Sequence, residues 1–301
     1  MSAITIEGSL FHYEKLGRGR PVILVHGWIG SWRYWIPLMQ QLHMRFSVYT
    51  LDLAGFGDSA KNAESYPLDK QVELLYRFME QLAIPKAALF GHGLGAMVLT
   101  HFANRYPERV ARLLLVSAPL FDVGSLRERA SLPTPRPIEN VSGRATAPAP
   151  APTTTPNRST NPLAEIIHER AMLTLLEKCF KKTDPTYEKL RVDLEKADAE
   201  AIRSSVQAFD SVEYLNHVRA LACPTVAVHG AEDPVIPVPS DDVWTYLTAD
   251  RDDLFVPIPL NGVRHFPMLE YEPFMRLAGD FLDTPDISKI EVRDRWRRRS
   301  R

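Results

Sequence analysis

The amino-acid sequence predicts an α/β protein with a mostly parallel sheet, flanked by helices and interrupted by an inserted helical cap. Short β-branched or aliphatic runs alternate with longer helical patterns, the order that a parallel sheet with crossover helices requires. The chain has 301 residues, 45% of them hydrophobic, so it can bury a large core. The strand-and-helix pattern changes between Ser117 and Cys223, which predicts an insertion into one domain.

The sequence predicts eight strands and two helices in order. The two opening segments predict an antiparallel ribbon, the next runs predict buried strands, and Tyr106-Pro107 marks the end of a helix. The expected strands are Ile4–Glu7 and Leu10–Lys15 for the ribbon, then Pro21–Val25, Phe46–Leu51, Lys86–Phe90, Arg112–Ser117, Thr225–Val228 and Leu254–Ile258. The expected helices are Leu94–Arg105 and a final one from about Glu270 to Leu282.

The insertion divides the core into two parts, 1–120 and 210–285, with 121–209 as the cap and 286–301 as a basic tail. Residues 131–162 are rich in Pro, Ala and Thr. Such a stretch cannot bury enough apolar surface to offset its ordering entropy, so we expect a disordered or polyproline-like loop. From Leu163 to about Phe209 the apolar spacing is helical again, which predicts a small helical cap.

Composition and charge exclude several classes of protein. The formal net charge is −1, so no global field would draw nucleic acid or an anionic membrane to the surface. Six arginines lie between Arg293 and Arg301. They indicate either a solvated terminus or a segment that contacts an acidic partner. No secretory signal or membrane span is visible, and the two cysteines lack metal-ligand spacing. We expect a cytoplasmic protein that needs no metal or other cofactor.

A glycine-rich pentapeptide directly follows the strand expected at 86–90. Its sequence Gly91-His92-Gly93-Leu94-Gly95 matches the pattern G-x-S-x-G except at Gly93, where the pattern has serine. In that pattern the middle residue lies on a sharp, strained turn. Glycine accepts such a conformation more easily than serine, which relieves about 1–3 kcal/mol of strain. A tight turn without chemical function is the other interpretation of the three glycines.

Three further segments accompany this motif. His26-Gly27-Trp28 follows one expected strand, Asp233 follows another, and His265 stands just before the final helix. With the pentapeptide, these segments resemble the α/β-hydrolase superfamily, in the branch with a helical lid, over 3–120 and 210–283. The resemblance implies small-molecule substrates with a carbonyl or ester group.

The resemblance also implies a function for each matching residue. The backbone N–H groups of Trp28 and Leu94 would form an oxyanion hole. His265 would be a base whose tautomer is held by Asp233. Gly93 would stand at the vacant position of the nucleophile, in the turn called the nucleophile elbow. The residues that would support the elbow and the oxyanion loop are His26, Gly27, Gly91 and Gly95.

Some nearby residues have other interpretations. The segment Asp52–Ser59 resembles the family's strand-end turn, and we interpret Asp52 and Ser59 as structural. The aromatic residues after the oxyanion loop would line a pocket or pack in the core. They are Trp28, Trp32, Tyr34 and Trp35. Ser31 and Ser117 are the nearest substitute hydroxyls, Asp122 is a second candidate acid, and Arg264 stands where many relatives have glycine.

Three hypotheses remain open at this point. The first is an enzyme of the hydrolase class that activates water with His265 and Asp233, with lyase or cofactor-free oxygenase chemistry as a variant. The second is a pseudoenzyme that binds a ligand or a protein. The third is an ordinary serine hydrolase in which Gly93 is an engineered or isolated change. Removal of a serine nucleophile typically costs about a millionfold in turnover, so any ester hydrolysis should be slow.

Overall fold

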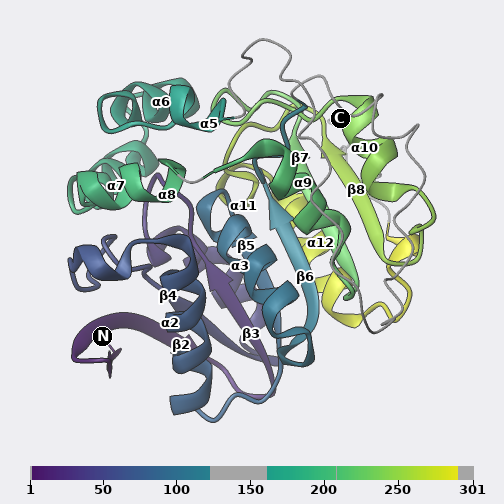
Figure 1. The fold of residues 1–301 in the computed structure, drawn as a ribbon, viewed down its shortest axis with the longest axis horizontal. Helices are drawn as coiled ribbons and strands as arrows, with labels where there is room; N and C mark the ends of the chain where they lie inside the picture. Colours follow the sequence, from purple (N-terminus) through teal and green to yellow (C-terminus); the bar gives the residue numbers. More distant parts are fainter. Residues whose placement is uncertain (1, 123–160, 208, 291–301) are drawn as a thin grey trace, which may run out of the picture.

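The computed structural model describes residues 2–122, 161–207 and 209–290. An eight-stranded sheet with the order β1-β2-β4-β3-β5-β6-β7-β8 forms its centre (Figure 1). The strands are β1 (Ser2–Ile6), β2 (Ser9–Leu16), β3 (Arg20–Val25), β4 (Phe46–Leu51), β5 (Ala87–His92), β6 (Val110–Val116), β7 (Thr225–Gly230) and β8 (Phe255–Leu260). Among the described strands, the antiparallel pairs are β1 with β2 and β2 with β4, and the other pairs are parallel. The predicted entry ribbon and mostly parallel sheet are therefore confirmed.

Helices pack in two groups beside this sheet. The α-helices are α1 (Ile36–Leu42), α2 (Leu68–Gln81), α3 (Leu94–Arg105), α5 (Leu163–Ile166), α6 (Met172–Cys179), α7 (Pro185–Glu195), α8 (Ala199–Gln207), α9 (Ser211–Arg219), α10 (Asp241–Thr248), α11 (Pro267–Glu270) and α12 (Glu272–Asp283). Single 3-10 turns are η1 (Trp32–Trp35), η2 (Ala63–Ser65), η3 (Pro107–Arg109), η4 (Glu169–Ala171) and η5 (Ile287–Lys289). Helices α2, α3, α9 and α10 pack side by side, and α1 packs with α11 and α12. Within the described ranges no helix is long and apolar enough to cross a membrane.

The strand order explains where a site can form. The chain moves from β3 to β4 on one side and then returns past β3 to β5. Because parallel crossovers are right-handed, this reversal places α1 and α2 on opposite faces of the sheet. The carboxyl ends of β3 and β5 diverge at the reversal, and ligands in open α/β sheets bind at such a point. The fold therefore brings His26-Gly27-Trp28 and Gly93 to one place.

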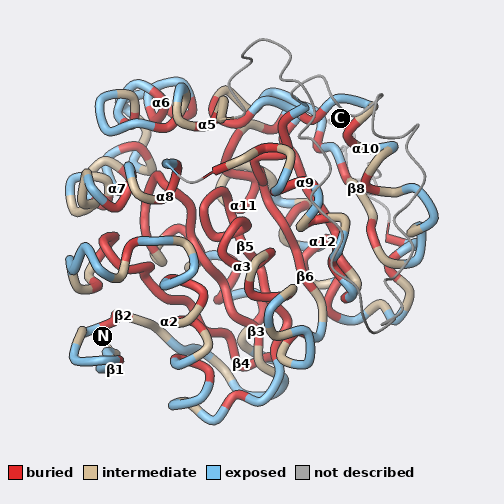
Figure 2. The backbone as a smooth tube through the Cα atoms, viewed as in Figure 1, coloured by how far each residue is buried: buried red, intermediate tan, exposed pale blue. Residues whose placement is uncertain are grey.

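The central strands form the core of the molecule. Every residue of β4, β5 and β7 is buried, and Figure 2 shows burial concentrated along the sheet while the outer helices face solvent. At the edge of the sheet, β8 carries Pro257 and Pro259. Proline has no N–H to offer a further strand, so these residues protect the exposed edge from pairing.

Helices α5 to α8, which we call the insertion helices, lie together at one side of the molecule (Figure 1). They occupy the helical part of the expected cap. The expected loop 131–162 falls outside the described residues except for its last two positions, as do the arginines of the tail. Where the sequence predicted one final helix, the structure has α11 and α12 on either side of Tyr271.

The first residues of the segment predicted as a tail, which begins at residue 286, pack against the core. Ile287 is 1% exposed and Ile290 is 8% exposed, and η5 packs against β8. Two apolar side chains in five residues gain enough from burial to hold this segment on the core. The sequence analysis did not predict this burial, because the many arginines from Arg293 onward led the whole segment to be interpreted as a basic tail.

Candidate active site

Gly93 lies at the turn between β5 and α3. Its backbone has φ 50° and ψ −109°, a conformation that residues other than glycine rarely adopt. Its N–H donates to the Val116 carbonyl at 2.9 Å, which fixes the turn against β6. The two flanking glycines are required by close packing. A Cβ atom on Gly91 would lie 2.6 Å from the Gly95 backbone, and one on Gly95 would lie 2.4 Å from the Val25 carbonyl oxygen.

The indole of Trp28 lies directly against this turn. A Cβ atom on Gly93 would be 3.1 Å from two carbons of the Trp28 ring, closer than most Cβ contacts. Trp28 is 1% exposed, and its Nε1 donates to Ser205 Oγ of α8 at 2.8 Å. Glycine at 93 and the indole of Trp28 therefore fit each other, and a larger residue at 93 would displace the ring by a few tenths of an ångström.

His265 and Asp233 form a buried hydrogen-bonded pair. His265 Nδ1 lies 2.8 Å from Asp233 Oδ2, while Oδ1 of the same carboxylate accepts the N–H groups of Val235 and Ile236 at 2.8 and 3.0 Å. Burial alone would raise the pKa of Asp233, but the charge of His265 and these hydrogen bonds lower it to about 2. The carboxylate is therefore ionised and accepts a hydrogen bond from the Nδ1–H group, which leaves Nε2 of His265 as the basic nitrogen.

His92, the second residue of the glycine-rich motif, connects three loops. Its Nε2 donates to the His265 carbonyl at 2.9 Å, so its Nδ1 must accept from the Tyr34 hydroxyl at 2.9 Å. The same hydroxyl accepts the Gly27 N–H at 2.5 Å. Burial lowers the pKa of His92 well below its ordinary value, which keeps the ring neutral. This network holds the loop that carries Gly27, the turn at Gly93 and the loop that carries His265 in one arrangement.

His26 fixes the same loop after β3 by two further hydrogen bonds. Its Nδ1 donates to the Gly27 carbonyl at 2.8 Å, and its Nε2 accepts the Leu53 N–H at 2.9 Å. Burial lowers the pKa of His26, in keeping with one donor and one acceptor nitrogen. His26 therefore ties the loop that carries Trp28 to the turn after β4.

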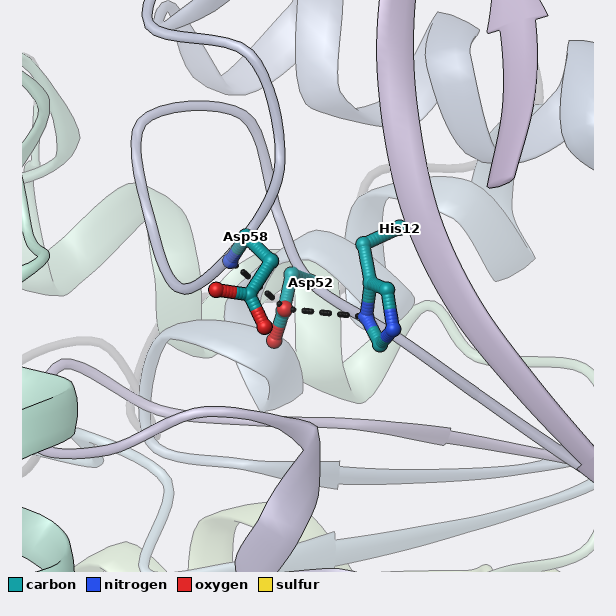
Figure 3. Close-up of side chains that lie close together, drawn as sticks. All are labelled: His12, Asp52 and Asp58. Carbon is teal, nitrogen blue, oxygen red and sulfur yellow. Dashed lines mark hydrogen bonds and ion pairs between the residues drawn. The ribbon is translucent and has the colours of Figure 1, made fainter. Parts of the chain in front are cut away.

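The turn after β4 contains a cluster of three ionisable side chains, His12, Asp52 and Asp58, whose ligand atoms lie within 4.8 Å of one another. Figure 3 shows His12 and Asp52 facing each other, 3.2 Å apart. The Asp58 carboxylate binds Arg33 and Lys196, each at 2.6 Å. A metal ion placed there would meet these side-chain cations at close range. We therefore assign the cluster a structural function, as the sequence predicted for Asp52.

Polar contacts join the insertion helices to the segment between β3 and α1. Asp193 of α7 is 3% exposed; it accepts the Ser31 hydroxyl at 2.6 Å and pairs with Arg33 at 3.0 Å. Arg33 in turn pairs with Asp58, which also binds Lys196 at the end of α7. The position of α7 is thereby coupled to the segment between β3 and α1.

Asp193→Ala should destabilise the protein by about 1–3 kcal/mol, since it leaves the Ser31 hydroxyl and the Arg33 guanidinium without their buried acceptor. The midpoint of urea unfolding measures the change. Glu188→Ala is the matched control on the same helix, because Glu188 is 60% exposed and its loss should cost less than about 0.5 kcal/mol. Equal midpoints for the two variants would contradict the assigned coupling.

Three other described side chains that could act as nucleophiles are hydrogen-bonded or unreactive. Ser31 donates to Asp193, and the Ser117 hydroxyl lies 3.5 Å from the His265 carbonyl. Cys179 of α6 is fully buried, and burial together with the nearby charge of Asp233 raises the pKa of its thiol. A buried thiol with a raised pKa has little of the reactive thiolate form.

The structure brings the nine predicted site residues to the carboxyl ends of β3, β5, β7 and β8. They are His26, Gly27, Trp28, Gly91, Gly93, Leu94, Gly95, Asp233 and His265. Leu94 opens α3, where a first-turn N–H has no intrahelical acceptor. Tyr34 and Trp35 are buried core residues, in agreement with the packing alternative. Sequence reasoning missed the connecting functions of His92 and Ser205. The position of His92 inside the glycine-rich motif could have indicated its function. Ser205 lies on α8, far away in the sequence, and no sequence pattern indicates its hydrogen bond to Trp28.

Comparisons with known proteins identify the family to which this fold belongs. Residues 20–249 match the model of the family described as alpha/beta hydrolase fold. The bifunctional epoxide hydrolase 2 of Mus musculus is 31% identical over 42% of this chain and 24% of its own length. The (lyso)-N-acylphosphatidylethanolamine lipase of Homo sapiens is 33% identical over 42% of this chain and 39% of its own length. The chain thus spans less than half the length of these curated relatives.

Solved structures resemble the whole fold at low sequence identity. A hydrolase from Pseudomonas aeruginosa PA01 superposes with a TM-score of 0.70 at 18% identity, over 94% of this chain and 98% of that one. A protein from Burkholderia cenocepacia described as a putative aryl esterase gives a TM-score of 0.69 at 20% identity, over 93% of this chain and 97% of that one. The sheet order, the turn at Gly93 and the family match over most of the chain lead to one conclusion: this chain belongs to the alpha/beta hydrolase fold family and is related to hydrolases.

Proposed function

We propose that this protein acts on a small carbonyl or ester-type substrate without forming an acyl-enzyme on a serine. His265 is the general base, Asp233 orients it, and the N–H groups of Trp28 and Leu94 are the oxyanion donors. Gly93 stands at the position of the nucleophile, and the insertion helices act as the cap.

The chemistry follows from the proton arrangement. Nδ1 of His265 donates to Asp233 at 2.8 Å. Nε2 can therefore take a proton from a water molecule while the oxygen of that water attacks a carbonyl carbon. The negative charge that develops on the carbonyl oxygen is stabilised by the two backbone N–H groups. Deprotonation of a substrate carbon by the same base gives the lyase or cofactor-free oxygenase variant.

The single observation that carries this proposal is the preserved His265–Asp233 pair beside an elbow without a hydroxyl. Asp233 accepts three hydrogen bonds and is held ionised. A purely structural loop does not require a buried carboxylate poised against an imidazole.

A second candidate function is binding without turnover. The contact between Trp28 and the position above Gly93, with the indole latched to Ser205, favours this candidate. The ring occupies space beside the position that a serine side chain would take. In this function the site and the insertion helices recognise a small ligand or a protein, and the bound partner displaces the indole of Trp28.

The test is turnover of a panel of short activated esters by the purified chain, with intact-protein mass spectrometry on samples quenched during the reaction. The proposal predicts slow product formation without an acyl adduct on the protein. An adduct that accumulates during turnover would contradict it and would identify a substitute nucleophile by peptide mapping. A chain inert on the whole panel would contradict hydrolysis and favour the binding function.

A further inference from the structure

A cavity of about 690 Å³ lies beside α3, between α2, α8 and α9. Helix α3 lies between α2 and α9 (Figure 1), and both helices pack against it. The volume falls within the range of small-molecule sites, about 300–1,000 Å³. None of the described residues that line this cavity takes part in the proposed reaction. The cavity is therefore separate from the site at Gly93.

The buried part of the cavity wall is apolar. Val72 of α2 and Met97 of α3 line it and are 2% and 1% exposed. Phe209, just before α9, and Tyr214 of α9 are also buried lining residues, and their ring centroids lie 5.7 Å apart. Because apolar groups leave water when they pack against such side chains, this part of the wall suits the hydrocarbon part of a ligand.

The exposed part of the wall is acidic. Asp69 of α2 and Glu213 of α9 are lining residues whose side chains face solvent. Asp210 accepts two backbone N–H groups at the start of α9, each at 2.9 Å, so its carboxylate is fixed at the wall. Among the described lining residues Arg105 is the one lysine or arginine. Three carboxylates against one guanidinium favour a cation at the opening of the cavity.

Two histidines of the wall do not reverse this balance. Burial and the neighbouring His217 lower the pKa of His101 to about 4, so His101 is neutral at neutral pH. The two ring centroids lie 4.4 Å apart with the planes inclined by 50°. His217 Nε2 lies 3.6 Å from Glu213 Oε1. Even with a proton on His217, the wall keeps three carboxylates against two cations.

We propose that this cavity binds a free organic ammonium ion with a short apolar chain. The chain lies against the buried apolar side chains, and the ammonium group lies at the opening, near Asp69 and Glu213. Such a ligand matches both parts of the wall, whereas an organic anion would meet three carboxylates. The site goes beyond the proposed function and shares no residue with the His265–Asp233 pair.

The test is calorimetric titration of the full chain with three probes of equal chain length: hexyltrimethylammonium, hexanol and hexanesulfonate. The expected result is one hexyltrimethylammonium ion per chain. Hexanol should bind at least about threefold more weakly, because each exposed carboxylate contributes up to about fivefold to the affinity for a cation, and hexanesulfonate should bind most weakly. Added salt should weaken the binding of the ammonium ion and not that of hexanol. No binding of the ammonium ion, or equal affinity for the three probes, would overturn the proposal.

Substitutions at the opening test the charge separately from the chain. Asp69→Asn combined with Glu213→Gln should weaken hexyltrimethylammonium binding by about threefold or more and leave hexanol binding unchanged. Glu188→Gln, at a side chain of α7 that is 60% exposed, is the matched control and should bind as the unmodified chain does. Arg105→Gln should strengthen the binding of the ammonium ion. Weaker binding in Arg105→Gln, or unchanged binding in the double variant, would contradict the assigned charge.

A cavity-filling substitution gives a second readout. Ser204 of α8 is a half-buried lining residue, and Ser204→Phe places a ring where the apolar chain would lie. Hexyltrimethylammonium should raise the melting temperature of the unmodified chain, because a ligand that binds only the folded state stabilises it. It should raise that of Ser204→Phe much less, and the melting temperature without the probe reports that this variant is folded. Equal shifts in the two proteins would place the ion elsewhere and overturn the proposal.

Discussion

Gly93→Ser is expected to raise the turnover of activated esters by at least about a hundredfold, against a ceiling of about a millionfold set by the loss of a nucleophile in serine hydrolases. The turn already has the φ and ψ of a strained elbow. His265 is oriented by Asp233 and can accept the new hydroxyl proton. The added hydroxyl therefore completes an arrangement in which the base and its orienting acid are in place.

The same substitution should lower stability. A serine at φ 50° adds strain of about 1–3 kcal/mol, and its Cβ approaches the Trp28 ring to 3.1 Å. Gly93→Ala carries the same strain without the hydroxyl, so it is the matched control for turnover and for the melting temperature. A gain of equal size in Gly93→Ala, or in Gly93→Ser combined with His265→Ala, would contradict the assigned chemistry.

Stability should fall steeply as the pH is lowered from 6.5. Burial lowers the pKa of three fully buried histidines, His26, His92 and His229, and brings that of His229 to about 4. Between the unfolded pKa of about 6.5 and the lower folded values, the unfolded chain binds protons that the folded chain does not. Each such proton costs about 1.4 kcal/mol of unfolding free energy per pH unit, so three cost up to about 4 kcal/mol per unit.

His12 gives the opposite contribution above that range. Burial alone would lower its pKa, but the hydrogen bond and charge of Asp52 raise it above 6.5. Its stabilisation is fully present below pH 6.5 and is lost as the pH rises through the folded pKa. The stability maximum should therefore lie near neutral pH.

Urea unfolding at pH 7, 6 and 5 measures this dependence. His229→Gln should reduce the slope by about one proton, because Gln carries no titrating group, and His168→Gln at an exposed position should leave it unchanged. A free energy of unfolding that stays constant from pH 7 to 5 would contradict the assignment of neutral buried histidines.

Much of the fold followed from local patterns. Strand β4 and helix α3 end where the sequence predicted. The end of α3 was predictable because Tyr106-Pro107 ends a helix by a local steric effect. The split at Tyr271 and the burial of Ile287 were missed. Both depend on how the chain packs against β8 and α1, which a periodic pattern does not report.

The site was predictable to a lesser depth. The order of the motifs along the sequence predicted that Gly93, Asp233 and His265 belong to one site. In the structure His265 Nδ1 lies 2.8 Å from Asp233 Oδ2. The contact of Trp28 with Gly93 and the hydrogen bond to Ser205 join residues up to 177 positions apart. No spacing rule connects such positions, so these contacts required the three-dimensional structure.

The central claim is that His265 acts as a base in a site without a serine nucleophile. The most direct test is the ratio of ester turnover by the unmodified chain to that by His265→Ala, measured on identically purified proteins with equal melting temperatures. The account predicts a ratio of about a hundredfold or more, the usual contribution of general base catalysis. Equal rates for the two proteins would contradict it.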